Sequence, residues 1–267
     1  MTRCLKIGLI FCSLQVWGQK FADVNYYLVD SLEYDNLSPE YQQLINTSLS
    51  WYHQAETDID RINAVNNIVK LCWDERVWPK YNYWVYEFTS EKLNEPQTDS
   101  VRTLMLQAYA GAVYYIGWNY YVASDYDKSL LYYTQCKDIY IEIGDSVGIS
   151  NALDNIGNVY LAQGESAKAL DYYKQALALR ELLNYTLGMA ASLTSIGSVY
   201  MEHGDYLNAY DQLKKSLSYY ESANYVPGIS SALNNLGFIE YYFGNHEGAM
   251  NYFQRSLTIK KQISDKP

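Results

Sequence analysis

Glycine recurs every 40 residues in the central and C-terminal parts of this 267-residue chain, at Gly117, Gly157, Gly197 and Gly237. The residues around each glycine also correspond, as in DNIGNVYLAQGESAKALDYY and TSIGSVYMEHGDYLNAYDQL. A fixed period of roughly 20 to 50 residues is typical of repeat proteins, in which each repeat buries its apolar face on its neighbours. We therefore expect an all-α fold, a right-handed α-solenoid of antiparallel helical hairpins.

The repeated positions predict how the two helices of a hairpin meet. Glycine inside a helix costs about 1 kcal/mol relative to alanine, so its recurrence indicates two helices that cross too closely for a side chain. Small and then large apolar residues follow each glycine on the second helix; they are Ser129, Ala169, Ala209 and Ala249, then Tyr133, Tyr173, Leu213 and Phe253. Turn-forming residues lie between the helices, and glycine there suits the left-handed conformation that often ends a helix.

The period also predicts where the helices lie. We expect first helices near residues 100–122, 146–163, 186–203 and 226–243. We expect second helices near residues 126–143, 166–183, 206–223 and 246–263.

These positions resemble the tetratricopeptide repeat, whose pattern is W-x2-L-G-x2-Y followed by A-x3-F and a proline. The glycine, Tyr120, Tyr160 and Tyr200, and the small-x3-aromatic pair match it. The period of 40 residues, the missing tryptophan and the missing late proline depart from it. The resemblance implies a concave groove, lined by the first helices, that holds an extended peptide or a partner helix.

Three regions follow from these patterns. Residues 1–18 have the layout of a secretory signal peptide, with Arg3 and Lys6 before the apolar run IGLIFCSLQVW. Residues 19–99 are expected to form irregular N-terminal helical repeats or a cap, with a helix start at Ser38-Pro39. Residues 100–267 are expected to form four 40-residue repeats.

The aromatic residues of the N-terminal part allow two interpretations. The five tryptophans after residue 18 lie there or in the first clear repeat, namely Trp51, Trp73, Trp78, Trp84 and Trp118. They form either an aromatic cap over the end of the solenoid or a ligand surface, and we favour the cap.

The signal peptide predicts export to the periplasmic or extracellular side of a bacterial membrane. Beyond it, no segment approaches 18 consecutive apolar residues, so we expect no direct membrane insertion of the mature chain. The formal charge of −10 argues against nucleic acid as a partner. Cys136 replaces a small buried residue of the repeat, which favours a core thiol over a disulfide.

No pattern in the sequence indicates catalysis. His203 and His246 occupy equivalent turns and lack the spacing of metal ligands, and no G-x-S-x-G, phosphate loop or C-x-x-C is present. We expect no enzyme activity, no metal site and no cofactor.

The resemblance places the binding residues on the inner face of the first helices. The groove positions flank each repeat glycine at −6, −3, −2, +1 and +4. No lysine or arginine occupies them, so the clamp that some family members use for a C-terminal carboxylate is absent. Asparagine both donates and accepts hydrogen bonds and can pair with a peptide backbone, while aromatic residues supply apolar anchors. The candidate ligand-binding residues are Tyr114, Trp118, Tyr121, Asn151, Asp154, Asn155, Asn158, Asn234, Asn235 and Phe238.

The whole chain also resembles exported tetratricopeptide sensor regions of bacterial membrane signalling proteins, whose output is a histidine kinase or a helix-turn-helix regulator. This resemblance rests on the signal peptide, the segment RINAVNNIVKLCW and the 40-residue repeats. It implies a non-enzymatic module that binds a peptide or protein segment. The alternative is a structural scaffold or assembly factor that holds another protein subunit.

The last hairpin lacks a polar capping helix after residue 263. We expect either that further repeats follow Pro267 in the gene or that the uncapped repeat is buried in a homodimer.

Overall fold

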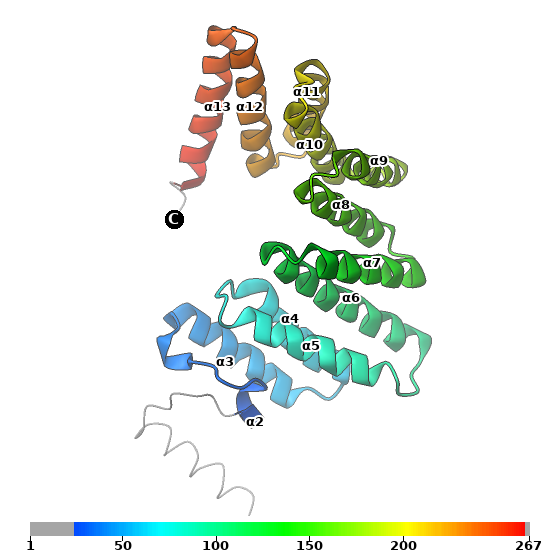
Figure 1. The fold of residues 1–267 in the computed structure, drawn as a ribbon. Helices are drawn as coiled ribbons and strands as arrows, with labels where there is room; N and C mark the ends of the chain where they lie inside the picture. The colour runs from blue at the N-terminus through cyan, green and yellow to red at the C-terminus, as the bar shows by residue number, and fades with distance from the viewer. Residues whose placement is uncertain (1–23, 265–267) are drawn as a thin grey trace, which may run out of the picture. The chain divides into compact units, whose positions relative to one another are not determined.

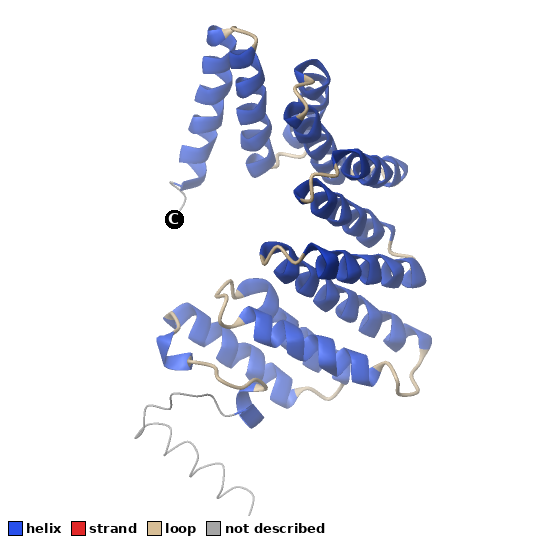
Figure 2. Ribbon diagram, viewed as in Figure 1, coloured by secondary structure: helices blue, strands red, loops and turns tan. Residues whose placement is uncertain are grey.

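Helices account for the ordered elements of the chain. The computed structural model describes residues 24–264, and these contain no β-strand (Figures 1 and 2). The expected signal peptide lies outside the described residues. The chain divides into two compact units, Met1–Asn119 and Tyr120–Pro267, whose boundary falls near the end of helix α6.

The first unit contains short elements followed by long helices. Its elements are α2 (Val24–Tyr27), the 3-10 helix η1 (Tyr34–Asn36), α3 (Pro39–Gln54), α4 (Asp58–Leu71), α5 (Trp78–Lys92) and most of α6 (Asp99–Val122). Ser38 caps α3 by accepting a hydrogen bond from the Tyr41 amide, with Pro39 in the first turn as expected.

The second unit is a series of antiparallel hairpins of similar length. Its helices are α7 (Tyr126–Ile143), α8 (Ser146–Ala162), α9 (Ser166–Leu182), α10 (Thr186–Glu202), α11 (Tyr206–Ser222), α12 (Val226–Tyr242) and α13 (His246–Ser264). Helices α8 and α9, α10 and α11, and α12 and α13 pack as pairs, and each pair also contacts the next one. The predicted helix positions and the all-α solenoid of hairpins are confirmed.

Turn glycines end the first helix of three hairpins, and Ser124 takes the corresponding place after α6. Gly164, Gly204 and Gly244 have φ angles of 78°, 72° and 78°, the left-handed region that glycine adopts without strain. Side chains cap the starts of α7 and α11, since the Asp125 and Asp205 carboxylates accept hydrogen bonds from the amides of Lys128 and Asn208, whereas Glu165 at the start of α9 makes no such bond. The 40-residue period therefore repeats the helix ends as well as the core.

The helix glycines make room for the large residue of the second helix. A Cβ on Gly157 would lie 2.7 Å from Cε1 of Tyr173, and one on Gly237 would lie 2.7 Å from Cε1 of Phe253. At Gly197 the nearest atom is Cγ of Leu213 at 2.9 Å, whereas the Ala209 carbonyl oxygen is at an ordinary 3.5 Å. The expected shortage of space is present, but large side chains cause it rather than the helix backbones.

A matched pair of glycine substitutions tests this packing. Gly157→Ala is expected to lower the free energy of unfolding by about 1–3 kcal/mol, because the added methyl group overlaps the buried Tyr173 ring. Gly111→Ala adds the same group where no atom lies within 4 Å; it is expected to stabilise the protein by about 0.4–1 kcal/mol. Urea unfolding of both variants measures the difference, and equal stabilities would show that the helix glycines are incidental.

The N-terminal tryptophans are divided between the core and the surface. Trp78 is buried, and Trp84 stacks on Phe88 with ring centroids 4.6 Å apart. Trp51 and Trp73 are 54% and 67% exposed, so they are not part of a closed aromatic cap.

Neither cysteine of the described region forms a disulfide, and both lie in the core. Cys72 and Cys136 are buried, as expected for Cys136 from its place in the repeat. Burial raises the pKa of the Cys136 thiol to about 12, so this thiol stays protonated and unreactive in the folded protein.

Candidate functional site

The predicted site residues lie on first helices in both units. Tyr114 and Trp118 belong to α6 in the first unit, where Tyr114 packs edge-on against Tyr115 and the Trp118 side chain is 43% exposed. The others belong to the second unit. Their roles in that unit differ, because some are engaged by other side chains and some are free to meet a ligand.

Arg180 on α9 extends to the predicted ligand-binding face of α8, where it binds the candidates Asp154 and Asn151. It is only 3% exposed. Its Nη1 group forms an ion pair with the Asp154 carboxylate, and its Nη2 group donates to Asn151 Oδ1 at 2.7 Å. The first helices supply no basic residue at the predicted groove positions, but this face does contain a basic group, because the second helix α9 supplies an arginine.

The same guanidinium connects two successive hairpins. Nε donates to Ser150 Oγ at 3.1 Å, and Nη1 donates to the Gly188 carbonyl at 3.1 Å and to Ser192 Oγ at 2.7 Å. Ser192 in turn donates to Asp154 Oδ1 at 3.3 Å. Burial raises the pKa of Asp154, and the positive charge and hydrogen bonds of Arg180 oppose that effect. We call Arg180, Asp154, Asn151, Ser150 and Ser192 the Arg180 cluster.

The register of the repeats contains a signal for this cluster. Arg180 stands where the neighbouring repeats have Tyr140 and Tyr220, and Ser192 stands where they have alanine. A single arginine among buried tyrosines requires buried acceptors, because an unpaired charge in a protein core is very costly. The site residues were predicted from the first helices alone, so this arginine on a second helix was not among them.

Asn158 and Asn155 are also used within the protein. The Tyr173 hydroxyl donates to Asn158 Oδ1 at 2.6 Å, and the Asn155 amide donates to the Asn151 carbonyl at 2.8 Å. Asn158 therefore helps to hold α8 against α9, which a free ligand-binding amide would not do. Tyr121 packs against Tyr126, with ring centroids 6.1 Å apart.

Helix α12 presents the candidates that remain free. Asn234 and Asn235 are partly exposed, and among residues 24–264 neither side-chain amide has a hydrogen-bond partner. One turn further on, the Phe238 ring is 59% exposed and packs edge-on against Phe253. Two amides and one aromatic ring therefore share an open helix face.

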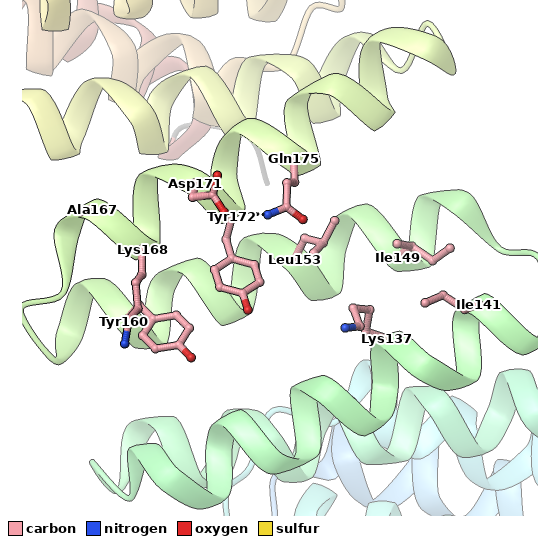
Figure 3. A pocket seen from close by; sticks show the side chains of 10 residues that line it. All are labelled: Lys137, Ile141, Ile149, Leu153, Tyr160, Ala167, Lys168, Asp171, Tyr172 and Gln175. Atoms are coloured by element: carbon pink, nitrogen blue, oxygen red, sulfur yellow. Dashed lines mark hydrogen bonds between the residues drawn. The ribbon is translucent and has the colours of Figure 1, made fainter.

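A cavity of about 780 Å³ lies on the opposite side of α8, between α7 and α9 (Figure 3). Tyr160 and Tyr172 stack with ring centroids 5.4 Å apart, and the Lys168 ammonium lies 5.0 Å from the Tyr160 ring centre. Lys137 lines this cavity where the following repeats have Leu177 and Leu217. None of the predicted site residues contributes to it, so it is separate from the predicted groove.

The geometry defines a class of protein, a solenoid of helical hairpins with polar and aromatic residues on one face of its first helices. The tetratricopeptide repeat family matches residues 109–181 and 188–262, which is more than half of the sequence. The chain belongs to the tetratricopeptide repeat family.

Known structures share the fold at low sequence identity. BtubC (BKLC) from P. vanneervenii is 16% identical with a TM-score of 0.67, and the alignment covers 86% of this chain and 94% of that one. A STAND signal transduction ATPase with a tetratricopeptide repeat sensor from Pyrococcus horikoshii is 16% identical with a TM-score of 0.63, over 85% of this chain and 34% of that one. A Rap protein complexed with Competence and Sporulation Factor is 17% identical with a TM-score of 0.56, over 86% and 68%.

Among curated proteins, no sequence matches this chain. In the described part of the chain, no helix is both long enough and apolar enough to cross a membrane.

Proposed function

We propose that this chain is a non-enzymatic module that binds a peptide or protein segment on the face of its first helices. The observation that carries the proposal is the free amide pair of Asn234 and Asn235 beside the exposed Phe238 ring. Carboxamides can pair with any peptide backbone, at about 0.5–1.5 kcal/mol for each hydrogen bond. The exposed ring supplies the apolar anchor that such weak bonds need.

The wider role that we propose is the sensor part of an exported bacterial signalling protein. The layout of residues 1–18 and the 40-residue repeats support it. Among the structures of similar fold, one is described as a tetratricopeptide repeat sensor and another is complexed with Competence and Sporulation Factor. Fusion of residues 1–24 to a reporter enzyme that is active only outside the cytoplasm tests the export.

The binding site is tested by separating binding from stability. The double substitution Asn234→Ala and Asn235→Ala is expected to weaken binding of a selected peptide by about 3- to 30-fold, because several backbone hydrogen bonds are lost. Its melting temperature should stay close to that of the wild type, because neither side chain holds another residue.

The peptide is selected by panning a random peptide library on the full chain and measured by isothermal titration calorimetry. Asn158→Ala is the control, since it removes the acceptor of Tyr173 and should lower the melting temperature. Unchanged affinity in the double variant would exclude this face of α12 as the site.

A scaffold role is favoured by a different observation. Met250 and Leu257 on α13 are 57% and 54% exposed, whereas Leu217, at the position of Leu257 in the preceding repeat, is 5% exposed. Such a face can hold another subunit, including a second copy of the chain. Sedimentation of the full chain and of Leu257→Glu tests whether this face binds a second copy of the chain, because only a homodimer held by this face would become monomeric.

A further inference from the structure

A second cavity lies in the first unit, between helices α4 and α6. Its volume is about 290 Å³, at the small end of ligand cavities, which suits one side chain rather than a whole small molecule. Its floor is apolar, with Ile62 and Val69 both buried. None of the ten candidate ligand-binding residues lines it, although the groove positions Gly111 and Tyr115 on α6 do.

Gly111 on α6 lines this cavity, and the packing of the protein does not explain this glycine. A Cβ at Gly111 would meet no atom within 4 Å, whereas a Cβ at Gly157 would meet the Tyr173 ring. Gly111 lies in the middle of a helix, where alanine would be more stable. Because Gly111 has no side chain, the cavity stays open.

The polar residues around the cavity are also free. The side chains of Asn63, Asn66 and Gln107 line it together with Lys70, and among residues 24–264 none of the four has a hydrogen-bond or ion-pair partner. Three carboxamides therefore offer donors and acceptors around an apolar floor, and one ammonium group stands beside them.

The charge of this lining differs from that of the other cavities described. No aspartate or glutamate contributes to it, although the chain carries a formal charge of −10. The cavity between α7 and α9 includes Asp171, and two further cavities of the first unit include Asp30 and Asp60. A lysine without a nearby carboxylate in the lining favours a neutral or negatively charged occupant.

We infer that this cavity is a subsite for one large apolar side chain of a bound peptide that carries an acidic residue next to it. The apolar side chain lies over Ile62 and Val69 in the space left by Gly111. The carboxamides of Asn66 and Gln107 pair with the peptide backbone, and Lys70 pairs with the acidic group. The inference rests on the proposed function in that the ligand is a peptide, and it adds a side-chain preference and a second place of contact.

Short peptides test the chemistry on the full chain by NMR titration. Acetyl-Gly-Phe-Glu-Gly-amide is expected to shift the side-chain amide signals of Asn63, Asn66 and Gln107. The phenylalanine-to-alanine peptide should bind about 10- to 100-fold more weakly, because the buried apolar surface is lost. The glutamate-to-glutamine peptide should bind about 1.5- to 5-fold more weakly, as expected for an exposed ion pair. Binding of 3-phenylpropionate as tight as that of the first peptide would show a site for free acids and overturn the inference.

Three variants test the location of the site and its charge preference. Gly111→Leu fills the cavity and is expected to abolish these shifts while the melting temperature is unchanged or raised by about 1–4 °C. Ala191→Leu places the same side chain in the same register of α10 and should leave the shifts intact. Lys70→Gln should remove the preference for glutamate over glutamine.

Full binding by Gly111→Leu, or no shift with any of the peptides, would overturn the inference. The proposed function would survive that result if a library-selected peptide still binds and depends on Asn234 and Asn235. It would fail separately if no peptide binds the chain at all.

Discussion

Asp154→Ala is expected to lower the free energy of unfolding by about 3–5 kcal/mol, one of the two largest effects among the single substitutions considered for the second unit. The reason is that Arg180, which is 3% exposed, would keep its charge without its carboxylate partner. Urea unfolding followed by circular dichroism at neutral pH measures the loss. A loss below about 1 kcal/mol would mean that water replaces the carboxylate and that the pair is not truly buried.

The neighbouring repeat supplies the matched control. At the positions of Asp154 and Arg180 it has Thr194 and Tyr220, and the Thr194 hydroxyl is hydrogen-bonded to the Ala190 carbonyl and to the Ser216 hydroxyl. The double variant Asp154→Thr and Arg180→Tyr removes both charges and is expected to stay within about 1–2 kcal/mol of the wild type, because replacing a whole buried ion pair is often nearly neutral. If the double variant is as unstable as Asp154→Ala, the hydrogen bonds of Arg180 to Gly188 and Ser192 are the main contribution.

Tyr173→Ala is expected to lower the free energy of unfolding by about 3–5 kcal/mol. The Tyr173 ring is fully buried over Gly157, and its hydroxyl group donates to Asn158 Oδ1 at 2.6 Å. Removing the ring leaves a cavity at the centre of the α8–α9 hairpin and an amide without its donor. Thermal and urea unfolding both measure the effect.

A double variant taken from the next repeat tests whether the repeats are interchangeable at this position. In the next repeat, Leu213 and Ser198 occupy the positions of Tyr173 and Asn158. Tyr173→Leu combined with Asn158→Ser should lower the free energy of unfolding by less than about 2 kcal/mol. The leucine still occupies the space over Gly157, and no asparagine amide is left without its donor. A cost equal to that of Tyr173→Ala would contradict the view that the repeats are interchangeable at this position.

The fold followed from the sequence because its determinants are local and repeated. Gly164, Gly204 and Gly244 mark the turns within each hairpin, and apolar residues return at the same positions in each helix. Four copies of one pattern also average out the exceptions that mislead the interpretation of a single helix. The first unit lacks this redundancy, so the sequence predicted helical pairs there but not their bounds.

The candidate site was harder to predict because the sequence does not say which polar groups are already paired. Asn158 and Asn235 are both asparagines on first helices. Asn158 accepts a hydrogen bond from the Tyr173 hydroxyl, whereas Asn235 has no partner among the described residues. The difference comes from a residue on another helix. Arg180 is the clearest example, because its partners lie 26 to 30 positions earlier and 8 to 12 positions later in the chain.

The contact between Gly157 and Tyr173 and the Arg180 cluster differ in how they are distributed over the repeats. Gly157 and Tyr173 lie in one repeat, so a gene duplication copies the space and the ring that fills it together. The Arg180 cluster takes acceptors from two successive repeats, so copying one repeat cannot produce it. It ties these two repeats together in this order. Shuffling or deleting repeats would therefore be tolerated at the other junctions of the array sooner than at the junction between α9 and α10.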